Sequence, residues 1–290
     1  MNITALPPEF RKQHITIDVE EWFHIIGVRI PDVSEWDDLT PTVEKNTQNI
    51  LKILEDTSNK GTFFFLGWVA KKYPELVREV HDAGHEVASH GFYHKDIRGL
   101  SDEEFYQGIR DAKLLLEDIT SAPVIGYRSP AFSSGQIRYF STIVDAGYTY
   151  DASVFPAKRD TGGNPDSPNY PYIIEFEDGR KLYEFPISTT RFLGRYFPNG
   201  GGYFRVYPLW LSKVLMRKML KESSGYLMFY IHPREVDGGT HPRIDITDPK
   251  KRLKTYAGLK KTAEKLEYIC EGFGSLSISN LCLKEDGKLF

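Results

Sequence analysis

Residues 14–24 read HITIDVEEWFH, an apolar stretch that ends in carboxylates. Its β-branched residues alternate with other residues, which predicts a strand at the buried start of a domain. Asp18, Glu20 and Glu21 stand at the end of this strand, although Asp is a poor strand former in apolar surroundings. Because parallel α/β folds carry their functional groups at the carboxyl ends of strands, this stretch predicts a fold class and one edge of a site.

Short apolar strands and amphipathic helices alternate along the chain. The sequences GTFFFLG (61–67), HEVASH (85–90) and VIGYRS (124–129) are the next predicted strands, and SLSISNL (275–281) is the predicted last one. Helical patterns lie between them. This alternation predicts an α/β protein with a parallel sheet or barrel.

The alternation is interrupted between residues 156 and 206. This region contains a loop rich in Pro, Gly and Asn, and then a predicted β-hairpin that turns at Asp178 and Gly179. GGGYFR (200–205) is predicted to be a flexible turn. We interpret the region as an insertion, so residues 1–290 are predicted to form a single domain.

The composition excludes some classes of partner. The chain has 37 Lys and Arg against 40 Asp and Glu, a net charge of −3 that does not favour nucleic acid. No apolar run approaches the length of a membrane span, and the first residues lack the apolar core of a signal peptide. We therefore expect a cytoplasmic protein, and the sequence is compatible with a homo-oligomer.

Polar residues of the types used by metal hydrolases stand at several predicted strand ends: Asp18, Glu20, Glu21, His90, His94, Arg128, Asp151 and His232. His90 and His94 are four residues apart, so on a helical turn both rings could reach one metal ion. Two imidazoles, a carboxylate and an open water position form a known catalytic zinc arrangement. Asp18 and Glu20 point to the same face of a strand, so one could bind the metal while the other takes a proton from water.

Each of these residues also has a simpler structural interpretation. The two histidines could face solvent, and Arg128 could be a surface residue instead of the counter-ion of Asp18. Asp151 could form a turn or an N-cap. His232 could be a core histidine, but as a catalytic residue it needs a carboxylate to orient it, which Asp151 could supply.

Five short motifs occur in an order that resembles a known family. They are TIDVEE (16–21), SHGFYH (89–94), YRSP (127–130), YDAS (150–153) and FYIHP (229–233). In these motifs the chain resembles the polysaccharide deacetylases of carbohydrate esterase family 4, the NodB-homology group. The resemblance implies a distorted (β/α)7 TIM-like barrel, with the interrupted region as a β-hairpin and loop insertion.

The resemblance also implies roles for the first two motifs. Asp18 corresponds to the catalytic base and Glu20 to a metal-binding acid, with Glu21 as the alternative ligand because this first motif departs from the commonest one. His90 and His94 correspond to metal ligands. The implied cofactor is Zn²⁺, or another divalent ion such as Co²⁺ or Ni²⁺.

The other three motifs imply the rest of the catalytic set. Arg128 positions the base, the backbone N–H of Ala131 helps to hold the oxyanion, Asp151 tunes the acid, and His232 is that acid. Ala131 stands where the family often has an aromatic residue, and Tyr230 stands where it usually has Leu. Contacts with the substrate are therefore expected to differ from those of chitin and peptidoglycan enzymes.

Further similarities point to a subgroup. The DVEEWF start, the EFPIS segment (184–188) and the GGGYF loop resemble the members encoded with bacterial exopolysaccharide and surface-glycan assembly systems. Trp22, Tyr203 and Phe204 could stack on sugar faces, although core packing is an equal alternative for these rings.

The predicted function is therefore a metal-dependent N-deacetylase that acts on an N-acetylated sugar in a bacterial polysaccharide or glycan precursor. A deformylase or metal-independent amide hydrolase on the same fold, and a non-catalytic glycan-binding pseudoenzyme, are the alternatives. A glycosidase that uses Asp18 and Glu20 is disfavoured, because the two carboxylates are too close in sequence to flank a sugar bond and the histidines would have no role.

Overall fold

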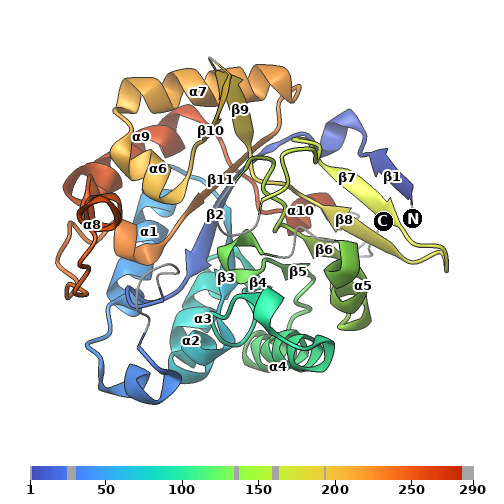
Figure 1. Cartoon of the computed structure of the whole chain (residues 1–290), viewed down its shortest axis with the longest axis horizontal. Helices are drawn as coiled ribbons and strands as arrows, with labels where there is room; N and C mark the ends of the chain where they lie inside the picture. The colour runs from blue at the N-terminus through green and yellow to red at the C-terminus, as the bar shows by residue number, and fades with distance from the viewer. Residues whose placement is uncertain (1, 25–30, 134–136, 159–162, 193, 283–290) are drawn as a thin grey trace.

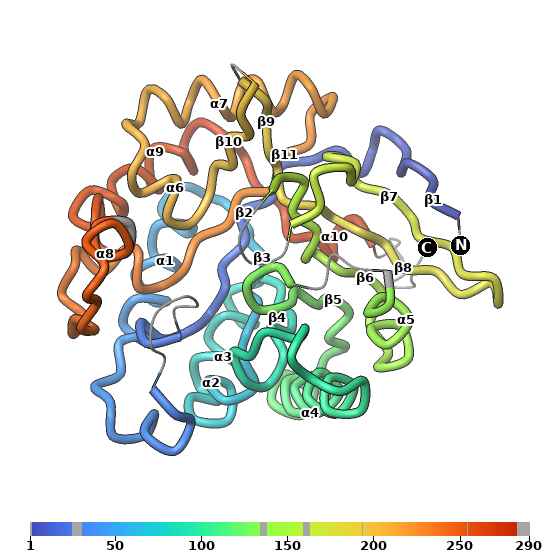
Figure 2. Tube along the Cα trace, in the orientation of Figure 1, coloured from blue at the N-terminus to red at the C-terminus, as the bar shows by residue number. Residues whose placement is uncertain are grey.

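The computed structural model describes residues 2–24, 31–133, 137–158, 163–192 and 194–282. A central sheet lies in the middle of the molecule, and most of the helices surround it (Figure 1). The sheet has the strand order β1-β7-β8-β6-β5-β4-β3-β2-β11. β2 and β11 are far apart in the sequence but run side by side as parallel neighbours (Figure 2).

The seven strands from β8 to β11 in this order are all parallel to their neighbours. They are β2 (Gln13–Val19), β3 (Gly61–Phe65), β4 (Glu86–Ser89), β5 (Gly126–Tyr127), β6 (Tyr150–Asp151), β8 (Lys181–Glu184) and β11 (Leu227–Ile231). The predicted α/β class with a parallel sheet is confirmed.

The sheet is not a closed ladder in the described part of the chain, because β1 and β11 are its two edges. The sheet is nevertheless curved, so that the segment that follows β8 lies beside β11. The N–H of Ser188 donates to the carbonyl of Met228 (3.3 Å), and the N–H of Met228 donates to Oγ of Ser188 (2.8 Å). A closed barrel is therefore not found among the described strands, and two hydrogen bonds of an irregular segment link the region after β8 to β11 instead.

The helices connect these strands. They are α1 (Val43–Asp56), α2 (Gly67–Lys72), α3 (Pro74–Asp82), α4 (Asp102–Thr120), α5 (Ile137–Asp145), α6 (Gly201–Val206), α7 (Leu209–Glu222), α8 (Pro249–Tyr256), α9 (Thr262–Gly272) and α10 (Ser279–Cys282). α4 begins at a capping box, in which Ser101 and Glu104 each bond the other's backbone N–H. No described helix has the length and apolar character that crossing a membrane requires.

Three local predictions need correction. The hairpin of β7 (Tyr172–Glu175) and β8 is present, but β8 also pairs in parallel with β6, so a barrel strand lies within the predicted insertion. GGGYFR forms most of helix α6 instead of a flexible turn. The predicted last strand is absent: its first residues bond the N-terminal ends of β2 and β3 from outside the sheet, and α10 follows.

Two antiparallel pairs complete the described strands. β1 (Asn2–Ala5) extends the sheet beyond β7, and β9 (Thr189–Phe192) pairs with β10 (Arg195–Pro198) as a separate hairpin. Neither pair belongs to the parallel part of the sheet.

The two faces of the parallel strands carry different side chains. On β2, Ile15, Ile17 and Val19 belong to the apolar cluster that includes buried residues of the surrounding helices. Thr16 and Asp18 alternate with them and are also buried. Because side chains alternate along a strand, this pattern directs Asp18 to the inner face of the curved sheet.

Candidate active site

Asp18 forms a buried ion pair with Arg128, which follows β5. The Nη1 atom of Arg128 lies 2.7 Å from Oδ1 of Asp18 and 2.8 Å from Oγ1 of Thr16, and its Nε donates to the carbonyl of Ala152 (3.0 Å). The guanidinium also lies 4.1 Å from the ring centroid of Phe64. The expected pairing of Asp18 with Arg128 is therefore present, and it fixes the Asp18 carboxylate at the end of β2.

Glu20, His90 and His94 form a buried cluster at the ends of β2 and β4. One ligand atom from each residue lies within 4.8 Å of the others. Nδ1 of His90 bonds the carbonyl of Arg128 (2.8 Å), so Nε2 of this ring remains for a ligand. Nε2 of His94 lies 2.7 Å from Oε2 of Glu20. These three residues form a set of donors suited to a divalent ion such as zinc.

The electrostatics of the cluster also fit a cation. Burial raises the pKa of Glu20, but His94, His232 and His90 lower it by more, so the net pKa lies below the usual range. Burial lowers the pKa of His90 to about 4, which leaves its ring neutral near neutral pH. Oε2 of Glu20 is buried and has no well-directed hydrogen bond from a described residue. An ionised carboxylate and a neutral imidazole are the forms that bind metals.

Glu21 has a structural role. Its carboxylate accepts hydrogen bonds from the backbone N–H groups of Thr42 and Val43, at 3.0 and 3.1 Å, where α1 begins. It is fully buried there and lies outside the three-residue cluster. Of the two candidate carboxylates, Glu20 is therefore the one that reaches the candidate metal site.

His232 follows β11 and faces both carboxylates of the first motif. Its Nε2 lies 3.8 Å from Oδ2 of Asp18 and 3.6 Å from Oε1 of Glu20. Its side chain is 18% exposed, against 2% and 5% for those of Asp18 and Glu20. Burial lowers the pKa of His232, but Glu20, Glu235 and Asp18 raise it by more. His232 is thus the most accessible of these three groups, and its environment favours the protonated ring.

Glu235, not Asp151, forms the hydrogen bond with Nδ1 of His232. Oε2 of Glu235 lies 3.0 Å from Nδ1 of His232, within the short 3-10 helix Pro233–Glu235. Nε of Arg205 donates to Oε1 of the same carboxylate (2.8 Å). The expectation that Asp151 would orient His232 is wrong, because Glu235 occupies Nδ1 of His232 and the Asp151 carboxylate bonds Ser153 and Glu184 instead. The signal that could have found Glu235 is the H-x-x-E spacing of a capping box, HPRE.

Asp151 instead takes part in a second buried carboxyl pair. It accepts a hydrogen bond from Oγ of Ser153, and its side chain also bonds Glu184 at the end of β8. Burial raises the pKa of both carboxyl groups, so the pair retains a proton at a pH where an exposed carboxyl is ionised. Arg128 exerts an opposing effect on both groups, which links this pair to the ion pair with Asp18.

Ala131 has an unusual backbone conformation. It lies in the short 3-10 helix Pro130–Phe132 with a φ of +56°, in the left-handed region that non-glycine residues rarely adopt. Its N–H donates to no described residue. The structure therefore leaves this N–H available, as expected for an oxyanion donor.

Two of the three proposed sugar-stacking rings are in the core. Trp22 is 5% exposed and its Nε1 donates to the carbonyl of Thr40 (2.9 Å). Phe204 is fully buried, with its ring centroid 4.9 Å from that of Phe229. Neither face is open to a sugar, so the substrate-binding prediction is wrong for Trp22 and Phe204. Tyr203 is half-buried, and its role stays a prediction.

Two features near the site were not predicted from the sequence. The ring of His24 stacks on that of His94, with centroids 5.8 Å apart, and its Nδ1 accepts the N–H of Glu21 (3.2 Å). Gly200 packs against Tyr230: a Cβ atom on this glycine would lie 2.4 Å from the Tyr230 ring. Gly200 and Gly201 thus allow the start of α6 to pack against the strand that presents His232.

Two family models match this chain. Residues 33–150 match the family model described as polysaccharide deacetylase. Residues 152–282 match a model described as a domain of unknown function, DUF3473. The parallel sheet contains strands from both matched regions.

Among individual relatives, a peptidoglycan-N-acetylglucosamine deacetylase from Bacillus cereus is 32% identical over 104 residues, 35% of this chain and 47% of that protein. A chitooligosaccharide deacetylase from Azorhizobium caulinodans is 34% identical over 73 residues, 25% of this chain and 35% of that protein. The chain thus spans less than half the length of these two curated relatives.

Solved structures share the fold. A Mycobacterium smegmatis crystal structure provisionally described as a polysaccharide deacetylase has a TM-score of 0.62 at 19% identity, and covers 96% of this chain and 92% of its own. The crystal structure of Puue allantoinase has a TM-score of 0.56 at 15% identity, with 91% and 87% covered. At these identities the likeness concerns the fold alone.

Proposed function

We propose that this chain is a metal-dependent N-deacetylase that hydrolyses the acetamide of an N-acetylated sugar. The observation that carries the proposal is the convergence of Glu20, His90 and His94, with Asp18 and His232 beside them. The N-deacetylases among the curated relatives support the reaction type.

A divalent ion held by Glu20, His90 and His94 would supply Lewis-acid chemistry, because it polarises a carbonyl and acidifies water. Asp18, held by Arg128, would take the proton of the attacking water. The N–H of Ala131 would donate to the oxyanion that develops on the acetamide oxygen, and one such donor is worth about 3 kcal/mol. His232 would give its proton to the departing sugar amine, which is otherwise a poor leaving group.

The proposal also specifies the metal ion and the substrate. Zinc is the proposed ion because of the two imidazoles and one carboxylate. A bacterial exopolysaccharide or surface-glycan precursor is the proposed substrate, on the strength of the DVEEWF, EFPIS and GGGYF segments.

The test is acetate release from a panel of N-acetylated sugars, measured with zinc-loaded protein and with protein stripped by a chelator. Release that depends on zinc supports the proposal. Release that survives stripping would indicate a metal-independent amide hydrolase, and release of formate from N-formyl sugars alone would indicate a deformylase. Absence of bound metal and of all release would indicate a glycan-binding pseudoenzyme.

A further inference from the structure

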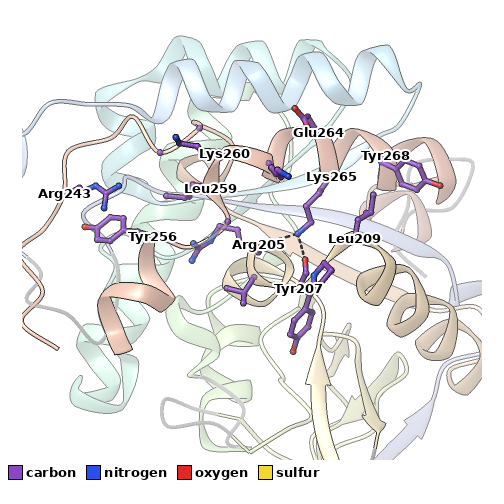
Figure 3. A pocket seen from close by; sticks show the side chains of 16 residues that line it. Arg205, Tyr207, Leu209, Arg243, Tyr256, Leu259, Lys260, Glu264, Lys265 and Tyr268 are labelled. Carbon is purple, nitrogen blue, oxygen red and sulfur yellow. Dashed lines mark hydrogen bonds between the residues drawn. The ribbon is translucent and has the colours of Figure 1, made fainter. Parts of the chain in front are cut away.

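A pocket lies outside the catalytic cluster. It has a volume of about 780 Å³ and lies between the C-terminal end of α6, the turn that precedes α9, and α9 itself (Figure 3). Its charged lining residues are Arg205, Arg243, Lys260, Lys261, Lys265 and Glu264. The lining has five cations and one carboxylate and stays net positive after Arg205 is paired with Glu235, in contrast with the net charge of −3 of the whole chain.

Two of the cations form the inner wall. Lys265 is buried, and its ammonium donates to the backbone carbonyls of Phe204, Arg205 and Tyr207 at the end of α6. Figure 3 shows Lys265 directed toward Tyr207. Burial first, and then the charge of Arg205, lower the pKa of Lys265 to about 8. Arg205 is paired with the buried carboxylate of Glu235, so the inner wall adds the charge of Lys265, whose ammonium already bonds backbone carbonyls.

The remaining three cations lie at the rim. Arg243, Lys260 and Lys261 are exposed, and none of them forms an ion pair with a carboxylate in the described part of the chain. The guanidinium of Arg243 lies 4.7 Å from the ring centroid of Tyr256, which orients it over one wall. The rim therefore offers cationic donors that no described acidic side chain satisfies.

The walls between these cations are aromatic. Tyr207, Tyr256 and Tyr268 line the pocket, with the Arg243 guanidinium over one face of Tyr256 and the Lys213 ammonium over one face of Tyr268. Aromatic rings with a polar edge suit the packing of a sugar ring. The volume lies within the range of roughly 300–1,000 Å³ that is usual for small-ligand sites, which favours a compact ligand over a long polyanion such as nucleic acid.

We propose that this pocket binds an anionic saccharide, in which carboxylate or phosphate groups pair with Arg243, Lys260 and Lys261 while a sugar ring packs on the tyrosines. Carboxylates and phosphates are the natural partners of Arg and Lys, and hydrogen bonds between ionised groups are stronger than neutral ones. The proposal does not depend on deacetylase activity, because the ligand need not carry an acetamide.

The experiment is isothermal titration of the full chain with digalacturonate and with glucose 1-phosphate, neither of which contains an N-acetyl group. The pocket variant combines Lys260→Glu with Lys261→Glu. The matched control combines Lys71→Glu with Lys221→Glu, two exposed lysines outside the pocket that produce the same change in net charge. We expect saturable binding of at least one probe, weakened about tenfold in the pocket variant and unchanged in the control.

The probe that binds identifies the anion as carboxylate or phosphate. Three outcomes would overturn the proposal: neither probe binds, the control loses as much affinity as the pocket variant, or inorganic phosphate and acetate bind as tightly as the two saccharides. If the double variant fails to fold, Arg243→Ala is measured instead. Unchanged affinity in that variant would also overturn the proposal.

Discussion

Nδ1 of His232 and Oε2 of Glu235 lie 3.0 Å apart at the end of β11. Burial raises the pKa of Glu235, but His232 and Arg205 lower it by more, to about 2, so the carboxylate is ionised when it meets the ring. An ionised partner on Nδ1 directs Nε2 toward Asp18 and Glu20 and stabilises the imidazolium. Glu235 is therefore the residue that positions the proposed acid.

Replacement of this carboxylate should weaken proton donation. In Glu235→Gln we expect kcat for acetate release to fall by about 10²-fold, with the alkaline limb of the pH–rate profile moved to lower pH, because the imidazolium loses its anionic partner. Zinc content should be unchanged, and Glu44→Gln on the surface of α1 serves as the control. An unaltered pH profile would remove Glu235 from the proposed mechanism.

Variants of the two adjacent glutamates should affect different properties, metal binding for Glu20 and stability for Glu21. We expect Glu20→Gln to lose bound zinc with little change in the free energy of unfolding of the metal-free protein. Glu21→Ala should keep its zinc and lose about 2 kcal/mol of stability, because the first N–H groups of α1 lose their acceptor. Elemental analysis and denaturant unfolding measure the two properties. If Glu21→Ala lost zinc and Glu20→Gln kept it, Glu21 would be the metal ligand instead of Glu20.

Asp18→Asn should separate catalysis from metal binding. We expect zinc to be retained and acetate release to fall by about 10³-fold or more, because the amide cannot take the proton of water. The melting temperature should also fall, since Arg128 keeps a buried charge without its carboxylate partner. Asp118→Asn on the exposed face of α4 is the control. Acetate release that persists at the wild-type rate would show that Asp18 is not the base.

His14 should contribute to acid sensitivity. It is buried, and burial lowers its pKa to about 4 from an ordinary value of 6.5. The unfolded chain then binds a proton that the folded protein does not, so this contribution to stability is complete above the unfolded pKa and is lost as the pH falls toward the folded one. Between about pH 7.5 and about pH 5 this amounts to about 2 kcal/mol.

Denaturant unfolding at the two pH values measures the effect. In His14→Gln, which cannot titrate in this range, the loss of stability on acidification should be smaller than in the wild type by about that amount. An equal loss in both proteins would show that His14 does not titrate on unfolding.

The sequence by itself predicted the parts of the site that depend on local spacing. Alternation along β2 places Asp18 with Thr16, on the opposite side from Ile17, and this holds in the structure because a strand has a period of two residues. The spacing of His90 and His94 also predicted a shared position, although residues 90–94 form an irregular segment and not the expected helical turn. The hairpin turn at Gly179 was also predictable from local sequence, because its φ of +85° is a conformation that favours glycine.

Tertiary structure alone decided the partners that come from distant segments. Only the structure shows that the Asp151 carboxylate bonds Glu184 of β8, while Glu235 takes the expected place of Asp151 at His232. The burial of Trp22 and Phe204, and the pairing of β8 with β6, depend in the same way on long-range packing. Local periodicity fixes the direction of a side chain from its own strand, but the distance between two strand ends follows only from the register and curvature of the whole sheet.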